Sequence, residues 1–168
     1  MLKPSHSLGI HFIFKPGAEH RIPLAAAKSI NSIAEQSSAM FSLALKALNV
    51  REDHMHMLVG AAPEIDTAAF IEMVQREISS VVKALGGPFR SFDWDPSVHI
   101  TLLPPWHLDI LAAFVRDQDT YHATHTLEQE LQEIFQPNGY ESVLLDDFDD
   151  EDNYELPRTT MDPKRFVN

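Results

Sequence analysis

Two histidines separated by a single residue, His54 and His56, are the side chains of this sequence best suited to bind a metal ion. They lie in an apolar run over residues 54–62, which predicts a β-strand. Because side chains alternate between the two faces of a strand, both imidazoles point to one face, while Met55 and Met57 point to the other. A strand presents two metal ligands in this way. Histidines in this pattern also occur as ordinary residues hydrogen-bonded to nearby backbone. Other parts of the sequence must therefore decide whether the pair binds a metal.

A later segment, over residues 114–130, carries the second motif. It reads Phe-Val-Arg-Asp-Gln, continues through histidines and reaches a predicted helix start at Thr126. Together with Asp-His-Met-His-Met-Leu over residues 53–58, it resembles the HUH single-tyrosine transposases of the small insertion-sequence and REP-associated type. In that family an Asp-His-hydrophobic-His-Leu strand faces a helix with a Tyr-hydrophobic-x-x-Gln motif, followed by histidines and a Ser/Thr-aromatic-x-x-Glu helix start. The resemblance extends over about residues 7–135 in the order of elements.

The resemblance implies a divalent-metal site made by His54, His56 and Gln118, with Mg²⁺ or Mn²⁺ as the ion. Neutral ligands leave the full charge of such an ion free to polarise a phosphate oxygen. Asp53 would then orient one imidazole from outside the ligand set. The resemblance also implies a homodimer and hairpin-containing single-stranded DNA as the ligand. We therefore expect a transposase-like protein that binds single-stranded DNA.

The family's nucleophilic tyrosine corresponds to Phe114, which has no hydroxyl group. Residues 114 and 118 share a helix face, so the family arrangement places a tyrosine beside the metal-bound phosphate, ready to form a 5′-phosphotyrosine link. Phe114 itself is otherwise an ordinary core aromatic residue. Tyr121 is a candidate substitute at a similar helix azimuth, but it lies roughly 10 Å further along a helix. It reaches the metal only if that helix breaks near Thr120 or if two chains build the site. We expect catalysis to be impaired, in a decayed or domesticated relative.

The remaining histidines suggest an alternative function, that of a phosphoesterase. His122 and His125 are expected at the surface or at a helix end, and His11 and His99 lie on predicted strands whose facing the sequence does not fix. His-Ile-Thr over residues 99–101 resembles one half of the paired HxT motif of two-histidine phosphoesterases, in which the histidines act as general acid and base. The only other match is His-Ala-Thr over residues 122–124, at the end of a helix. This alternative is therefore less favoured.

The elements that position these residues follow the order β-α-β-β-α-β, with further helices appended. Asp66 is the expected N-cap of the longest helix, Gly86 and Gly87 end it, and Thr126-x-x-Gln129 is an expected capping box. This order predicts an α+β fold with a ferredoxin-like antiparallel sheet and helices on one face. Periodicity and turn residues predict strands over 7–14, 40–50, 54–62 and 97–103, and helices over 24–38, 67–85, 106–121 and 126–135.

The charge of the chain works against binding to phosphate. The net charge is −12, and residues 142–168 contain eight acidic residues against three basic ones. We expect one domain over residues 1–141 and a flexible acidic tail over 142–168. The lack of cysteine and of a signal peptide favours the cytoplasm. No apolar run approaches the roughly 18 residues that span a bilayer, so a membrane protein is not expected.

An interaction protein without catalysis, built on the same scaffold, is the alternative from a different class. Its acidic tail would contact a basic partner. The positions of basic residues distinguish the two possibilities, because clustering around the histidine face favours DNA and scatter favours the interaction protein. The residues to be placed are Arg51, Arg76, Lys83, Arg90 and Arg116.

Overall fold

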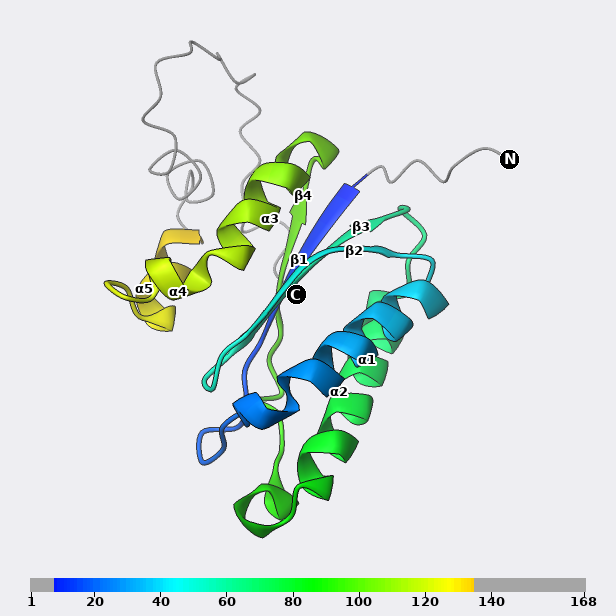
Figure 1. The fold of residues 1–168 in the computed structure, drawn as a ribbon. Coiled ribbons are helices and arrows are strands. Elements are labelled where there is room, and N and C mark those ends of the chain that lie inside the picture. Colours follow the sequence, from blue (N-terminus) through cyan, green and yellow to red (C-terminus); the bar gives the residue numbers. More distant parts are fainter. Residues whose placement is uncertain (1–7, 135–168) are drawn as a thin grey trace.

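A four-stranded antiparallel sheet with the strand order β2-β3-β1-β4 forms the centre of the computed structural model, which describes residues 8–134. This order is the ferredoxin-like arrangement that the sequence predicts (Figure 1). The predicted tail over 142–168 lies outside the described residues. The strands are β1 (Leu8–Phe14), β2 (Ala44–Val50), β3 (Met55–Ala61) and β4 (His99–Leu103).

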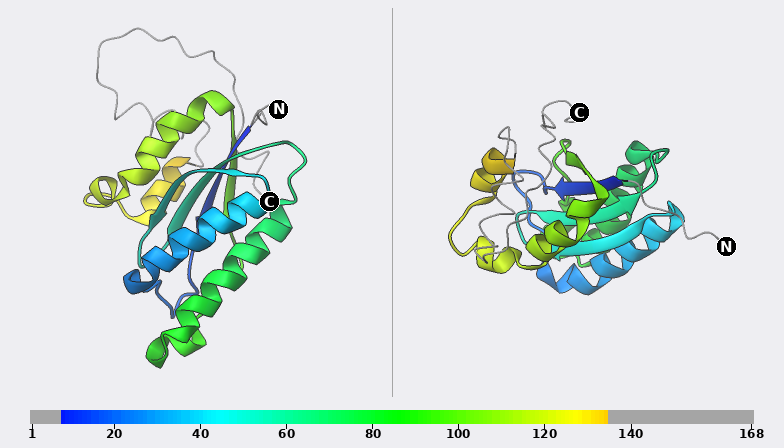
Figure 2. Two further views of the ribbon diagram at one scale, coloured as in Figure 1. Left: turned by 45° about the vertical axis from the view of Figure 1, so that its right-hand side comes forward. Right: turned by 90° about the horizontal axis from the view of Figure 1, so that it is seen from above.

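Two long helices, α1 (Ala27–Met40) and α2 (Thr67–Ala84), cover one face of the sheet (Figures 1 and 2). The appended helices α3 to α5 lie on the opposite side and cover part of the second face. The prediction of helices on one face therefore holds for α1 and α2 alone. The remaining elements are η1 (Leu24–Ala26), η2 (Gly87–Ser91), η3 (Pro105–His107), α3 (Leu108–Arg116), α4 (Gln118–Tyr121) and α5 (Leu127–Ile134).

The main core lies between the sheet and the two long helices. Met55, Met57 and Val59 of β3 point into it and are fully buried against Phe70 and Val74 of α2. The alternation of side chains along β3 requires His56 and Leu58 to point the other way. Removing this apolar surface from water is the principal force that fixes the register of the strand, because a shift of one residue would exchange the two faces.

A second, smaller core forms under α3 on the face that carries the histidines. Leu58 of β3 meets Leu111, Phe114 and Val115 of α3, and all four are buried. Gly9 of β1 permits this contact, since a Cβ atom at that position would lie 2.6 Å from a methyl carbon of Leu108. The second core holds α3 against β2 and β3.

Local signals place several boundaries of the elements. The Asp66 carboxylate accepts a hydrogen bond from the amide of Ala69 at 3.0 Å, which confirms it as the N-cap of α2. The second strand begins later than predicted, because α1 extends to Met40 and Ser42 turns the chain with a φ of 56°. At the start of α5, the reciprocal bonds between Thr126 and Gln129, at 2.8 and 3.2 Å, confirm the capping box.

The predicted continuous helix over 106–121 is wrong. The chain leaves helical geometry at Asp117, where φ is −96° and ψ is 25°, and this residue separates α3 from α4. The amide of Asp117 bonds back to the carbonyl groups of Ala113 and Phe114, at 3.0 and 3.2 Å, which tightens and ends α3. The break changes the direction of every side chain that follows.

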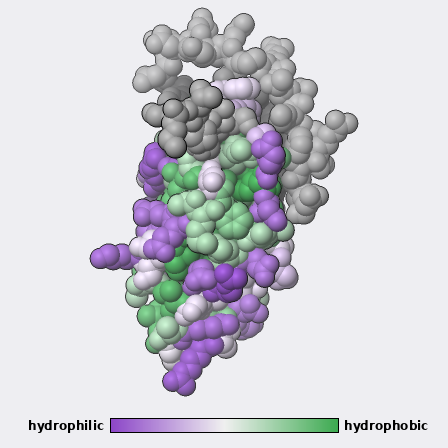
Figure 3. Space-filling model, turned by 90° about the vertical axis from the view of Figure 1, so that its right-hand side faces the viewer, coloured by the Kyte–Doolittle hydropathy of each residue, from purple (hydrophilic) through white to green (hydrophobic). Residues whose placement is uncertain are grey.

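The surface viewed in Figure 3 has hydrophobic residues near its centre and hydrophilic residues around them. Large hydrophobic side chains that are exposed within residues 8–134 include Met40 and Trp106, at 69% and 61% exposure. None of the described helices is long and apolar enough to cross a lipid bilayer.

Candidate metal centre

The two histidines of the first motif lie side by side at the start of β3 and are fully buried. His54 and His56 have no exposed area, and their ring centroids are 4.8 Å apart. Both face away from Met55 and Met57, as the alternation of a strand predicts. The described structure therefore brings the two predicted ligands together on the face covered by α3 to α5.

The Nδ1 atom of each of these histidines lies within hydrogen-bond distance of a neighbouring side chain. Asp53 Oδ1 lies 2.8 Å from Nδ1 of His54, and a carboxylate there accepts the N–H and leaves Nε2 as the free lone pair. Nδ1 of His56 lies 2.9 Å from Nε2 of His11, a buried histidine of β1. When Nδ1 of His56 carries the proton in this contact, its Nε2 also presents a lone pair. Both Nε2 atoms then point away from Asp53 and His11.

The charge states of His11 and Asp53 agree with these hydrogen bonds. Burial, with the neighbouring His56, lowers the pKa of His11 to about 3, so His11 is neutral at physiological pH and can accept a hydrogen bond. The hydrogen bond from His54 lowers the pKa of Asp53 to about 2, which keeps that carboxylate ionised. Asp53 thus occupies the position from which it would orient an imidazole.

Two residues that the sequence analysis did not place in the site, His122 and Glu130, join the two histidines. Glu130 Oε2 lies 3.2 Å from Nε2 of His122 and 3.5 Å from Nε2 of His56. Of the two positions expected for His122, the surface or a helix end, the structure has the helix end, because His122 follows Tyr121 at the C-terminus of α4 and its side chain is only 5% exposed. Its Nδ1 donates to the carbonyl of His125 at 2.9 Å, which again leaves Nε2 directed inward.

A signal for Glu130 was present in the sequence. The capping box at Thr126 fixes where α5 begins, and Ile134 lies one helical turn after Glu130. Both residues are fully buried, so Glu130 occupies the apolar face of a short helix. An acidic residue on such a face needs a cation or several donors, because burying a lone carboxylate is costly. For His122 the signal was the pair of histidines that follows the second motif, but the sequence did not show which way its side chain points.

The titration of the cluster follows from burial and mutual contact. Burial acts to raise the pKa of Glu130, but His122 and His56 outweigh it and hold the pKa below its ordinary value. Burial, with the neighbouring His54 and His122, lowers the pKa of His56 despite the nearby Glu130 carboxylate. For His122, Glu130 and the His125 carbonyl overcome the effect of burial and raise the pKa. Glu130 is therefore the negative charge of an otherwise neutral or weakly cationic group of side chains.

Gln118, the third predicted ligand, is fully buried at the start of α4 and adjoins the same cluster. Its Nε2 donates to the carbonyl of Phe114 and to Oε1 of Glu130, both at 3.4 Å. Its Oε1 atom is buried without a hydrogen-bond partner. The amide thus contacts Glu130 directly, and its role as a ligand stays a prediction.

The two aromatic candidates for the nucleophile pack against each other. Phe114 is 5% exposed, and its ring centroid lies 5.1 Å from that of Tyr121. The Tyr121 hydroxyl donates to Oε2 of Glu133 at 2.7 Å, and its ring stacks on His125 at 4.4 Å. The helix breaks at Asp117, and α4 ends at Tyr121, so the role of Tyr121 as a substitute nucleophile stays a prediction. Phe114 occupies the core position that its side chain suggests.

The residues of the cluster fit a divalent cation. The ligating atoms of His54, His56, His122 and Glu130 all lie within 4.8 Å of one another. The three Nε2 atoms and Oε2 of Glu130 are buried and make no bond of hydrogen-bond geometry. Buried polar atoms without hydrogen-bond partners are unusual in native proteins, and coordination of an ion is one way to satisfy them. Three imidazole nitrogens and one carboxylate suit Zn²⁺ and other transition metals better than Mg²⁺, which prefers oxygen ligands.

The rival HxT arrangement does not occur in the described residues. His99 and Thr101 lie on β4, but His122 and Thr124 follow α4 in a turn and belong to no strand. His122 instead contacts His54, with ring centroids 4.7 Å apart. The two-histidine phosphoesterase reading therefore lacks the second strand that it requires.

The basic residues are scattered and do not cluster around the histidine face. Arg51 and Arg116 lie there, since Arg51 pairs with Asp119 and Arg116 donates to the carbonyl of Lys46 on β2 at 2.7 Å. The others are on α2 and η2, which belong to the opposite layer. These are Arg76, Lys83 and Arg90.

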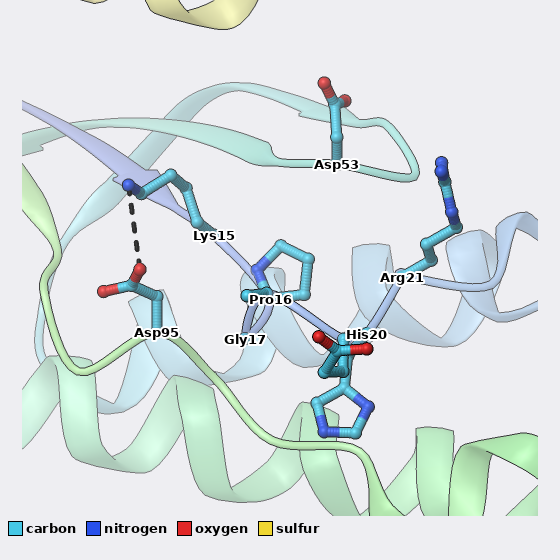
Figure 4. Close-up of a pocket in the computed structure, with 9 residues that line it drawn as sticks. Lys15, Pro16, Gly17, His20, Arg21, Asp53 and Asp95 are labelled. Atoms are coloured by element: carbon cyan, nitrogen blue, oxygen red, sulfur yellow. Dashed lines mark ion pairs between the residues drawn. The ribbon is translucent and has the colours of Figure 1, made fainter.

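A pocket of about 430 Å³ lies beside the β2–β3 hairpin, outside the histidine cluster (Figure 4). The loop over 15–21, Asp53 and Asp95 line it, and Lys15 pairs with Asp95 across it at 3.7 Å. Asp53 is the one residue shared between this pocket and the surroundings of His54. Its lining alternates in charge and includes none of the four clustered residues.

A ferredoxin-like sheet that presents His-x-His from a central strand to a short C-terminal helix segment is the arrangement of an HUH-type protein. The chain belongs to the IS200-like transposase family, whose model, "Transposase IS200 like", matches residues 4–118. A comparison with curated proteins finds no match.

Two solved structures have the same fold. One is a Deinococcus radiodurans R1 protein assigned as a transposase, with 21% identity, a TM-score of 0.52, and coverage of 75% of this chain and 99% of that chain. The other is a REP-associated tyrosine transposase bound to a REP hairpin, with 9% identity, a TM-score of 0.54, and coverage of 73% of this chain and 72% of that chain. Identities this low show similarity of fold alone.

Proposed function

We propose that this protein binds hairpin-containing single-stranded DNA and does not cleave it through a covalent tyrosine intermediate. The observation that carries this proposal is the position of Phe114. It precedes Gln118 by four residues, as the tyrosine of the family motif does, and it is buried without a hydroxyl group. The scaffold and the β3 histidines of the family are retained. The protein is then a decayed or domesticated transposase.

A divalent cation held by His54 and His56 would polarise a phosphate oxygen, which is the chemistry the family resemblance implies. Gln118 lies beside these histidines and contacts Glu130, so it would help to fix the polar side of the site. Asp53 and His11 hold the two imidazoles in one orientation. Without a nucleophile at position 114, this site does not support strand transfer, and recognition of DNA would fall to exposed residues on the same face.

Contacts to DNA would come from the histidine face. Arg116 is exposed at the end of α3, and Arg51 lies at the end of β2 on the same side. The REP hairpin in the related structure supports a nucleic-acid ligand of this kind. Only these two guanidinium groups are proposed to contact DNA phosphates. We therefore expect weak binding that depends strongly on salt.

A protein-interaction module is the second candidate, and the scatter of Arg76, Lys83 and Arg90 over the other layer favours it. By this view the scaffold is retained for a protein partner, and the net charge of −12 selects a basic one. The homodimer implied by the resemblance stays a prediction under both candidates.

Fluorescence anisotropy with a labelled DNA hairpin tests the DNA proposal. Arg116→Gln should weaken binding and reduce the slope of log K against log salt by about one. Arg76→Gln is the matched control, because Arg76 is also exposed but lies on α2, where its described hydrogen bonds go only to its neighbour Glu77. Equal effects of both variants would place the DNA elsewhere. No binding by the wild type at low salt would favour the interaction module.

A further inference from the structure

The histidine cluster contains five buried polar atoms that lack hydrogen-bond partners. They are the Nε2 atoms of His54, His56 and His122, Oε1 of Gln118 and Oε2 of Glu130. A buried polar atom without such a partner is costly, and the atoms of the three histidines and Glu130 lie within 4.8 Å of one another, with contacts of 3.5 and 3.2 Å from Glu130 to His56 and His122. The Nδ1 atoms of the same histidines are all engaged outside the cluster. The cluster therefore has the form of a set of ligands oriented towards one point, where a cation would fit.

The donors of this set come from two parts of the chain. His54 and His56 belong to β3, whereas His122 follows α4 and Glu130 belongs to α5. An ion bound by all four would join the C-terminal helices to the sheet. The described contacts between α5 and the rest are otherwise few, since Glu130 and Ile134 are its buried residues.

The set also leaves no visible room for a substrate. His54, His56 and Glu130 have no exposed area, and the side chain of His122 is 5% exposed. Structural zinc sites are closed, with four protein ligands, whereas catalytic sites use three and keep a position open for water or substrate. Glu130 also supplies a negative charge, which lowers the positive charge that an ion could offer to a phosphate.

We propose that His54, His56, His122 and Glu130 form a closed four-ligand site for Zn²⁺ or a similar transition-metal ion, which fastens the α4–α5 segment to the sheet. Gln118 positions the Glu130 carboxylate through its N–H group. The ion stabilises the fold, and a DNA phosphate would reach it only after a ligand leaves. The proposal does not depend on DNA binding, so either can fail alone.

Calorimetry on the full chain, after removal of metal with a chelator, tests the ligand set. We expect Zn²⁺ and Co²⁺ to bind tightly and Mg²⁺ to bind weakly. Glu130→Gln keeps the size of the side chain and should lower Zn²⁺ affinity by about 100-fold or more, since even changes outside the ligand set cost about 10- to 100-fold. Glu128→Gln is the matched control, because Glu128 is exposed on the same helix.

Further measurements test the coordination geometry of the ion and the attachment of the α4–α5 segment to the sheet. Bound Co²⁺ should show the intense visible absorption of a four-coordinate ion, and Zn²⁺ should slow hydrogen exchange of the α5 amides. Saturating Zn²⁺, at about 100 times its Kd, should raise Tm by about 5 °C or more.

Weak, six-coordinate Co²⁺ spectra would overturn the proposal, as would Mg²⁺ binding as tight as Zn²⁺ binding or unchanged affinity in Glu130→Gln. These results would indicate an open site of His54, His56 and Gln118. If Glu130→Gln does not fold, His122→Asn decides by the same measurements, and unchanged Zn²⁺ affinity in it would equally overturn the proposal. DNA binding measured on the same samples separates this proposal from the proposed function.

Discussion

The ring of Phe114 packs edge-on against Tyr121, with centroids 5.1 Å apart and planes 72° apart. One residue is in α3 and the other in α4, and the break at Asp117 brings them into this contact. The hydroxyl of Tyr121 is directed to Glu133, at 2.7 Å. The aromatic pair therefore forms part of the small core under α3. Both candidate positions for a tyrosine nucleophile lie in this pair.

Substituting Phe114→Tyr tests whether a hydroxyl group at this position can act as a nucleophile. We expect no covalent adduct between wild type and labelled hairpin DNA in the presence of Mn²⁺. Phe114→Tyr adds one hydroxyl at the family's position and should form an adduct, although slowly, because the DNA must also be held in line with the nucleophile. Denaturing gel electrophoresis detects the adduct. A wild-type adduct that Tyr121→Phe abolishes would show that Tyr121 is the nucleophile and that the protein is an active enzyme.

Acid should destabilise the metal-free protein through His11. Burial lowers its folded pKa to about 3, whereas an unfolded histidine titrates near 6.5. Between these values the unfolded chain binds more protons, so this contribution to stability is fully present above about pH 6.5 and is lost as pH falls towards 3. Urea unfolding at several pH values measures the slope. His11→Asn removes the titrating group and should flatten it, and an equal slope in both proteins would contradict the assignment.

Leu111→Ala tests whether the core under α3 is an integral part of the fold. Leu111 is fully buried between α3 and the sheet, so the substitution should lower the free energy of unfolding by about 2–5 kcal/mol. Leu24→Ala is the control, because Leu24 is 54% exposed and should change stability by no more than about 0.5 kcal/mol. Denaturant titration followed by circular dichroism gives both values. A cost at Leu111 as small as that at Leu24 would mean that α3 docks only loosely.

Removing residues 142–168 should strengthen binding to single-stranded DNA. This segment has eight acidic residues and three basic ones, and like charges repel phosphate within a Debye length of about 10 Å at 0.1 M salt. The gain should be largest at low salt and vanish at high salt, as measured by anisotropy. A variant with the acidic residues replaced by amides should behave like the truncation. Lower affinity, or a large fall in Tm, would show that the segment has a structural role.

The sequence by itself determined the features that depend on local periodicity. Alternation along β3 placed His54 and His56 on one face, Asp66 capped α2, and the reciprocal bonds of Thr126 and Gln129 started α5. Each of these involves residues a few positions apart, so backbone geometry alone fixes their relative directions. The order of the elements then led to the ferredoxin-like sheet.

Only the tertiary structure decided which residues complete the cluster. A continuous helix from 106 to 121 would have sent His122 towards the surface, but the chain turns at Asp117 and again after Tyr121. These turns return the segment to the sheet, where Glu130 meets His56. The path depends on contacts between residues far apart in the chain, such as the packing of α3 on Leu58, and no local pattern encodes them. The partners of a buried carboxylate are set by the fold, because only the fold determines what surrounds it.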